Sequence, residues 1–192
     1  MQKYRRLEIL GILVVSISFF ILVSLIGYNS NEEPTISPSV QIENPMGILG
    51  VYISHYLIKL TFGLSAVILP TLGLFWGWFF FSKRKLKDLK KTSIYGLIMM
   101  ILLSITVGTI EIITSKEGEV NYISSGLIGG NISQLIIDWL SIWGALLFLL
   151  SGFLIILRSY FDFDYHSYFI EFGKIFKLWF SKLQFKKEIK KR

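Results

Sequence analysis

The sequence predicts an all-α membrane protein: four transmembrane helices, two short extracytoplasmic interfacial helices and a cytoplasmic amphipathic helix. Three observations predict this fold class. Long uncharged apolar runs raise the hydrophobic share of the chain to 53%, above the ~45–50% usual in soluble domains, and the mean hydropathy is +0.58. The basic residues gather between these runs, and one segment that begins with glycine occurs twice. Lipid is therefore the expected solvent of most of the chain.

Four uncharged apolar runs have the length of a membrane-spanning helix. They are residues 9–27, 60–81, 92–110 and 139–157. Each approaches the ~20 residues that cross a bilayer, and only a helix pairs the backbone groups of a lone segment inside lipid. The first run follows a basic start, but it is longer than a signal-peptide core and no small-residue cleavage site follows it. We therefore expect it to be an uncleaved first span.

The distribution of basic residues predicts the direction of each span. Eighteen of the 20 lysines and arginines lie in the N-terminal segment, in the loop 82–91 or in the tail after residue 157. The loop 29–45 carries three glutamates and no basic residue. Because segments rich in lysine and arginine stay on the cytoplasmic side, we expect both termini and the loop 82–91 to be cytoplasmic.

The segment 47–81 is too long for one straight span. As a single helix it would measure about 50 Å, whereas the hydrocarbon core is ~30 Å thick. Lys59 and Gly63 indicate a break, and Pro70 is a second candidate for a kink. The segment 126–157 has the same plan, with Asp138 at the break. We therefore expect residues 47–59 and 126–138 to form short helices at the outer membrane surface.

These two short segments form an internal repeat, because residues 47–59 align without gaps to residues 126–138. In both copies two glycines and a serine stand at positions i, i+3 and i+7, which places small residues along one helix face. The residues are Gly47, Gly50, Ser54, Gly126, Gly129 and Ser133. Such a stripe lets helices approach closely in a membrane, and we expect it to be a packing face. As an alternative, the glycines only shape the turn into each helix.

The C-terminal tail, residues 159–192, is aromatic and basic, and it follows a predicted four-helix domain of residues 1–158. Aromatic residues recur at three- and four-residue spacing, with Lys174, Lys177 and Lys182 largely between them and Trp179 among them. This pattern is typical of an amphipathic helix that lies on an anionic inner leaflet. Basic and aromatic residues also bind nucleic acid. The tail leaves the membrane directly after residue 157, so lipid is the expected partner and direct nucleic-acid contact is not.

Catalytic, cofactor-binding and metal-binding patterns do not occur in the sequence. It contains no cysteine, two widely separated histidines and no P-loop, so we expect no enzyme activity, no cofactor and no metal. Glu111 and Asp138 stand at span edges, where we expect them to be solvated interfacial groups. His55 is expected on the polar face of the first short helix.

Several glycine and proline positions resemble the N-terminal membrane domain of the FtsK/SpoIIIE DNA translocases over about residues 5–160. The similar positions are Glu8, Gly11, Gly27-Tyr28-Asn29, Asn44-Pro45-x-Gly47-x-x-Gly50, Phe62-Gly63-x-x-Ala66-x-x-Leu69-Pro70, Gly126-x-x-Gly129-x-x-x-Ser133 and Trp143-Gly144-Ala145. The first outer loop departs from the family's Ser-Tyr-x-x-x-Asp-Pro-Ser, because it reads GYNSNEEPT.

The resemblance implies a four-span anchor and assembly domain of a DNA translocase that acts in cell division and chromosome segregation. It also implies the cytoplasmic (inner) membrane of a bacterium as the location. In that family the anchor carries a cytoplasmic, hexameric, ATP-driven motor, and we expect the motor to be absent from this chain. The expected partners are the lipid bilayer, further copies of the chain and proteins of the division septum. The alternative is a small tetraspan scaffold or pore subunit unrelated to DNA.

Overall fold

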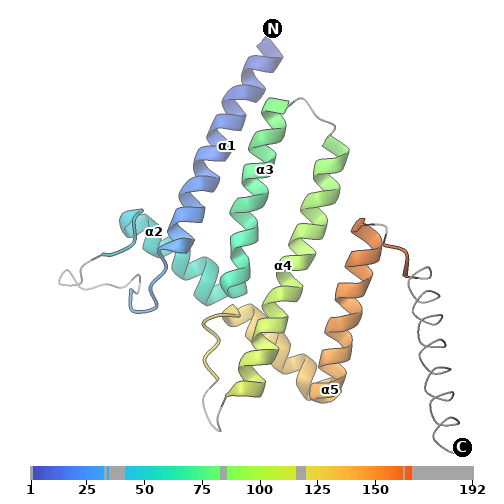
Figure 1. Ribbon diagram of the computed structural model, residues 1–192. Coiled ribbons are helices and arrows are strands. Elements are labelled where there is room, and N and C mark those ends of the chain that lie inside the picture. The colour runs from blue at the N-terminus through green and yellow to red at the C-terminus, as the bar shows by residue number, and fades with distance from the viewer. Residues whose placement is uncertain are drawn as a thin grey trace, which may run out of the picture. The chain divides into compact units, whose positions relative to one another are not determined.

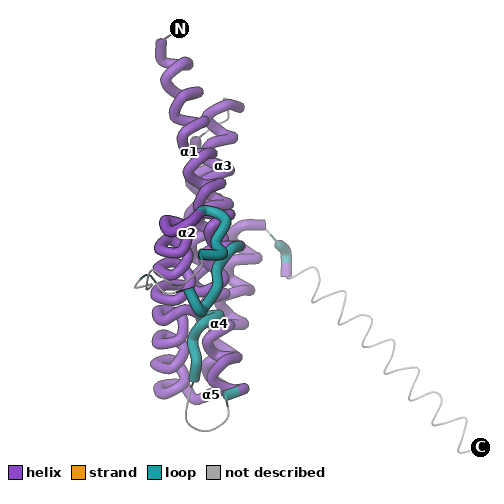
Figure 2. Tube along the Cα trace, turned by 90° about the vertical axis from the view of Figure 1, so that its left-hand side faces the viewer, coloured by secondary structure: helices purple, strands orange, loops and turns teal. Residues whose placement is uncertain are grey.

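The computed structural model describes residues 2–32, 34, 42–82, 86–115, 120–161 and 163–165. These residues form helices and connecting loops, without a strand among them (Figure 2). The elements are α1 (Gln2–Ile26), α2 (Gly47–Ser54), the π-helix η1 (His55–Phe62), the 3-10 helix η2 (Gly63–Val67), α3 (Ile68–Ser82), α4 (Leu86–Thr114) and α5 (Gly126–Phe161). The tail residues Lys174, Lys177, Trp179 and Lys182 lie outside the described residues.

Four helical segments are long and apolar enough to cross a membrane. They are Arg5–Ile26, Gly47–Phe81, Leu89–Thr114 and Gly126–Phe161. The predicted class, an all-α protein with four candidate spans, is therefore confirmed for the described residues. Most of their large apolar side chains are exposed, Trp139 and Trp143 to 82% each. In water such exposure would be costly, whereas lipid solvates these side chains.

The chain divides into two compact units, Met1–Phe153 and Leu154–Arg192. In the second unit, Arg158 Nη1 donates to Phe163 O at 2.8 Å and the Tyr165 hydroxyl donates to Leu154 O at 2.7 Å. The residues that follow α5 therefore fold back on its last turns. The domain boundary that we place after residue 158 stays a prediction.

In the first unit α1 and α3 lie side by side (Figures 1 and 2). A Cβ added to Gly73 would overlap Ser18 Oγ, and one added to Gly77 would overlap the Val15 side chain. From the other helix, a Cβ on Gly11 would lie 3.2 Å from the Phe80 side chain. Gly73 and Gly77 form a G-x-x-x-G pair, which permits close contact between membrane helices. This pair was missed in the sequence analysis, although the motif is visible there.

The first short helix does not continue straight into α3. We call residues 47–67 the first hook: α2 and η1 run obliquely to α3, and the chain turns at Gly63, which has φ 63° and ψ −145° (Figure 1). The helix continues through Lys59 to Phe62, so the bend lies at Gly63 and not at Lys59. Pro70 is the third residue of α3, in its first turn, where proline is well tolerated.

The second copy has the same form. Residues 126–141, the second hook, run obliquely before α5 turns at Ser141, which has φ 61° and ψ 170° (Figure 1). The expected break at Asp138 was wrong by three residues, because Asp138 still belongs to the helix and accepts a hydrogen bond of 2.9 Å from Gln134 Nε2. The expected bend in each combined segment is therefore present, whereas the placement of both hooks at a membrane surface stays a prediction.

Candidate functional site

The two hooks meet backbone to backbone at Gly63 and Gly126. The amide of Leu64 donates a hydrogen bond of 2.9 Å to Ser124 O. A Cβ on Gly63 would overlap Ser124 O, and one on Gly126 would overlap the backbone of Gly63 and lie 2.7 Å from Ile58 O. Both glycines are buried, with φ of +63° and +72°. No residue with a side chain fits either place without movement of the backbone.

Small residues dock the second hook on α4. A Cβ on Gly129 would overlap Ser104 Oγ, and Ser104 Oγ itself donates to Ser125 O at 2.8 Å. Ser133 Oγ lies 2.7 Å from Ile105 O on α4 and 2.7 Å from Gly129 O on its own helix. Ser104, Ser125 and Ser133 are fully buried. These contacts satisfy buried hydroxyls at a close helix crossing, as membrane helices require.

Facing this crossing from α4, Gly108 leaves room for the second hook. Its added Cβ would lie 2.5 Å from Ser133 Oγ and 3.1 Å from Gly129 O. Ser104 and Gly108 are therefore the α4 counterpart of the stripe predicted for the hook. Their small-x-x-x-small spacing is visible in the sequence, but it was not identified there because it stands within a longer apolar run.

The carboxylate of Glu111 holds the entry to the second hook. It accepts hydrogen bonds from the amides of Ser124 and Ser125, at 2.9 Å and 3.3 Å, and from the Ser125 hydroxyl. Its negative charge lies beside the N-terminus of α5, where the helix dipole favours an anion. The expectation of a solvated group at a span edge was wrong, because Glu111 is half-buried and satisfied by protein donors.

In the first half Asn44 has a similar position before α2. Its Nδ2 donates to Ser24 O at 3.0 Å and to Gly27 O at 3.1 Å, and its Oδ1 accepts the Met46 amide at 3.0 Å. Asn44 is 4% exposed, and a Cβ on Gly50 would overlap its Oδ1. One buried amide therefore joins the end of α1 to the start of the first hook.

The six stripe residues thus have different surroundings. Gly50, Gly126, Gly129 and Ser133 lie at close contacts, and Ser54 is buried with its hydroxyl donating to Val51 O at 3.1 Å. Gly47 differs, because a Cβ there would have no atom within 4 Å while its φ is +64°. Its geometry fits the alternative role, which is to shape the turn into the helix. That the stripe serves assembly stays a prediction.

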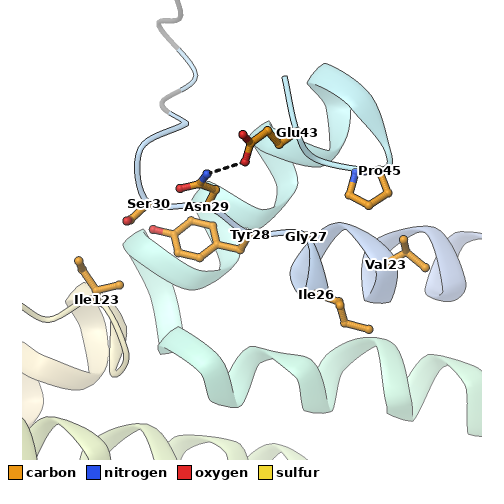
Figure 3. A pocket seen from close by; sticks show the side chains of 9 residues that line it. All are labelled: Val23, Ile26, Gly27, Tyr28, Asn29, Ser30, Glu43, Pro45 and Ile123. Carbon is orange, nitrogen blue, oxygen red and sulfur yellow. Dashed lines mark hydrogen bonds between the residues drawn. The ribbon is translucent and has the colours of Figure 1, made fainter. Parts of the chain in front are cut away.

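A broad depression lies beside the junction (Figure 3). Its volume is about 620 Å³, and its lining consists of Val23, Ile26, Gly27, Tyr28, Asn29, Ser30, Glu43, Pro45 and Ile123. On its wall Asn29 Nδ2 donates to Glu43 Oε2 at 3.1 Å. Three or more histidine, aspartate or glutamate side chains that could hold a metal ion do not gather anywhere in the described ranges.

A family model described as the 4TM region of DNA translocase FtsK/SpoIIIE matches residues 3–173. The match includes the four candidate spans, both hooks and the start of the tail. No curated protein and no solved structure matches the chain.

Proposed function

Because the chain belongs to the family of the 4TM region of the DNA translocases FtsK/SpoIIIE, we propose that it is the membrane anchor and assembly domain of such a translocase. The proposed setting is cell division and chromosome segregation. The observation that carries the proposal is the family match over residues 3–173. The four candidate spans support it, since they give the chain the multi-pass character that an anchor needs.

We further propose that both termini and the α3–α4 connection face the cytoplasm. The basic residues support this orientation, because 18 of 20 lie in these segments. Both hooks then lie on the outer side. Trp139 and Trp143 flank the second bend and are 82% exposed, and tryptophan is enriched where membrane meets water. At that level Lys59 and Asp138 avoid the ~2.5–3.5 kcal/mol that a charge costs at mid-membrane.

The proposed partners follow from this arrangement. The tail binds the anionic inner leaflet, the chain assembles with further copies of itself, and proteins of the division septum recognise it. The proposed anchor makes no direct contact with nucleic acid and performs no catalysis. A motor domain would supply ATP hydrolysis and DNA movement to the translocase.

A reporter fusion tests the proposal. A fluorescent protein joined after Arg192 should stay in the membrane fraction and concentrate at the septum of dividing bacterial cells. As a control, the four-span anchor of an unrelated membrane protein should spread evenly in the same cells. An even distribution of both fusions would contradict the septal role, and a soluble reporter would contradict the anchor itself.

A further inference from the structure

The two hooks bend at the same kind of backbone conformation but with different residues. Gly63 has φ 63° and ψ −145°, and Ser141 has φ 61° and ψ 170°. This region of φ/ψ space is populated almost only by glycine, because a Cβ clashes with the neighbouring peptide groups. Ser141 is the one residue other than glycine with positive φ among those that the structure describes. The second bend is therefore strained where the first is not.

Such strain persists only where the surrounding structure imposes it. Ser141 is exposed, and so are Leu140 and Ile142 on either side of it. Close packing at the bend itself therefore does not hold this conformation. The first bend differs, since Gly63 is buried against the backbone of Ser124 and Ser125.

The two arms of α5 impose the bend, because both are docked on α4. The arm before Ser141 is held by Ser133 and Gly129, at the crossing described above. In the arm after it, Ala145 is fully buried and Leu149 is 4% exposed. A Cβ on Gly152 would lie 3.1 Å from the Leu102 side chain. Two docked arms thus keep the residue between them in an unfavourable conformation.

Glu111 completes the arrangement at the far end of the first arm. Its three hydrogen bonds to Ser124 and Ser125 fix the start of α5. If these bonds are lost, the first arm keeps its small-residue contacts with α4 and the contacts of Gly126 and Ser124 with the first hook, but no longer the carboxylate that fixes its start. The strain at Ser141 then favours release of this arm, because a helical φ/ψ at Ser141 relieves it.

We propose that α5 is a strained hinge, held bent by Glu111 and able to straighten when this carboxylate releases the second hook. Straightened, its 36 residues form one helix of about 54 Å. That helix exceeds the ~30 Å core of a bilayer, so the freed arm stands out from the membrane. A molecule that contacts the freed arm on the outer side can thereby change the tilt of the span that leads to the tail. This device goes beyond the proposed anchoring role, and its placement at the outer surface rests on the proposed orientation.

Spin labels on the two arms test the hinge. The chain has no cysteine, so cysteines can replace Asn131 and Leu150, which are both exposed. In a straight helix these positions are about 29 Å apart, and the bend shortens the distance. In nanodiscs the parent protein should show the short distance. Glu111→Ala should raise the population at the longer distance about tenfold, which corresponds to the loss of hydrogen bonds that hold only the bent form.

Substitution of Ser141 separates strain from the hydroxyl group. Ser141→Gly relieves the strain, so added to Glu111→Ala it should restore the short distance. Ser141→Ala removes the hydroxyl and keeps the strain, so it should not restore it. The hinge is contradicted if Glu111→Ala leaves the distances unchanged, or if the glycine and alanine variants behave alike.

A stability measurement covers the case in which Glu111→Ala does not fold. In the otherwise unchanged protein, Ser141→Gly should raise the unfolding temperature by a few degrees and Ser141→Ala should not. Equal unfolding temperatures for the two variants would overturn the proposal, because then no strain is stored at the bend.

Discussion

The amide of Leu64 donates to the carbonyl of Ser124 across 2.9 Å, and this bond joins the bend of the first hook to the entry of the second. Gly63 and Gly126 lie beside it with their backbones in contact. The halves of the repeat therefore do not merely resemble each other in sequence. They form one junction, at which neither Gly63 nor Gly126 has room for a side chain.

The junction predicts that alanine substitution at two glycines of the repeat lowers stability by different amounts. Gly126→Ala should destabilise the protein by about 2–5 kcal/mol, because positive φ and a clash with the backbone of Gly63 add together. Gly47→Ala is the matched control, since it has positive φ in open space and should cost only about 1 kcal/mol. Thermal unfolding in detergent measures both. Equal losses of stability in the two variants would contradict the backbone contact between Gly126 and Gly63.

The close crossing of the second hook with α4 predicts that one added methyl group lowers stability. Gly129→Ala should displace Ser104 Oγ, break its bond to Ser125 O and reduce stability by about 1–3 kcal/mol. Gly152→Ala is the control on the same helix, because its Cβ would approach only the flexible end of the Leu102 side chain, at 3.1 Å. The same unfolding assay measures both variants, and a larger loss of stability for Gly152→Ala would show that α5 packs differently.

The buried amide of Asn44 predicts a cost at the entry of the first hook. Asn44→Ala leaves three backbone groups at the end of α1 and just before α2 without their partner, so stability should fall by about 1–3 kcal/mol. Asn29→Ala removes two exposed bonds, one to Glu43 and one from the Asn31 amide, and should change stability by less than about 0.5 kcal/mol. A comparable loss from both variants would contradict the role of Asn44 as a buried connection.

The part of the tail after residue 165, which lies outside the described residues, supports a prediction from sequence alone. A peptide of residues 165–183 should become helical on vesicles that contain anionic lipid and should dissociate as salt is added. Replacement of Lys174, Lys177 and Lys182 by glutamine should remove the preference for anionic lipid while Trp179 keeps some apolar binding. If the parent peptide bound neutral and anionic vesicles equally well, the predicted electrostatic contribution to binding would be contradicted.

The sequence predicted much of the fold, because the length of an apolar run and the positions of its charged residues are visible within one segment. The four spans, the bend in each long segment and the crowded surroundings of Gly50 and Gly129 follow from patterns within one segment. The partners of Glu111 and Asn44 could not be predicted in this way, because they lie on other segments. Ser141 was missed for a related reason, since docking of both arms imposes a conformation that serine does not favour by itself.

In the proposed orientation both hooks lie on the outer side of the membrane and both chain ends lie inside. Single cysteines at Ser37, Asn121, Lys87 and Lys187 test this orientation directly in intact cells with a thiol reagent that does not cross the membrane. We expect labelling at positions 37 and 121, and labelling at 87 and 187 only after the cells are opened. Labelling of Lys87→Cys in intact cells, with none at Ser37→Cys, would contradict it.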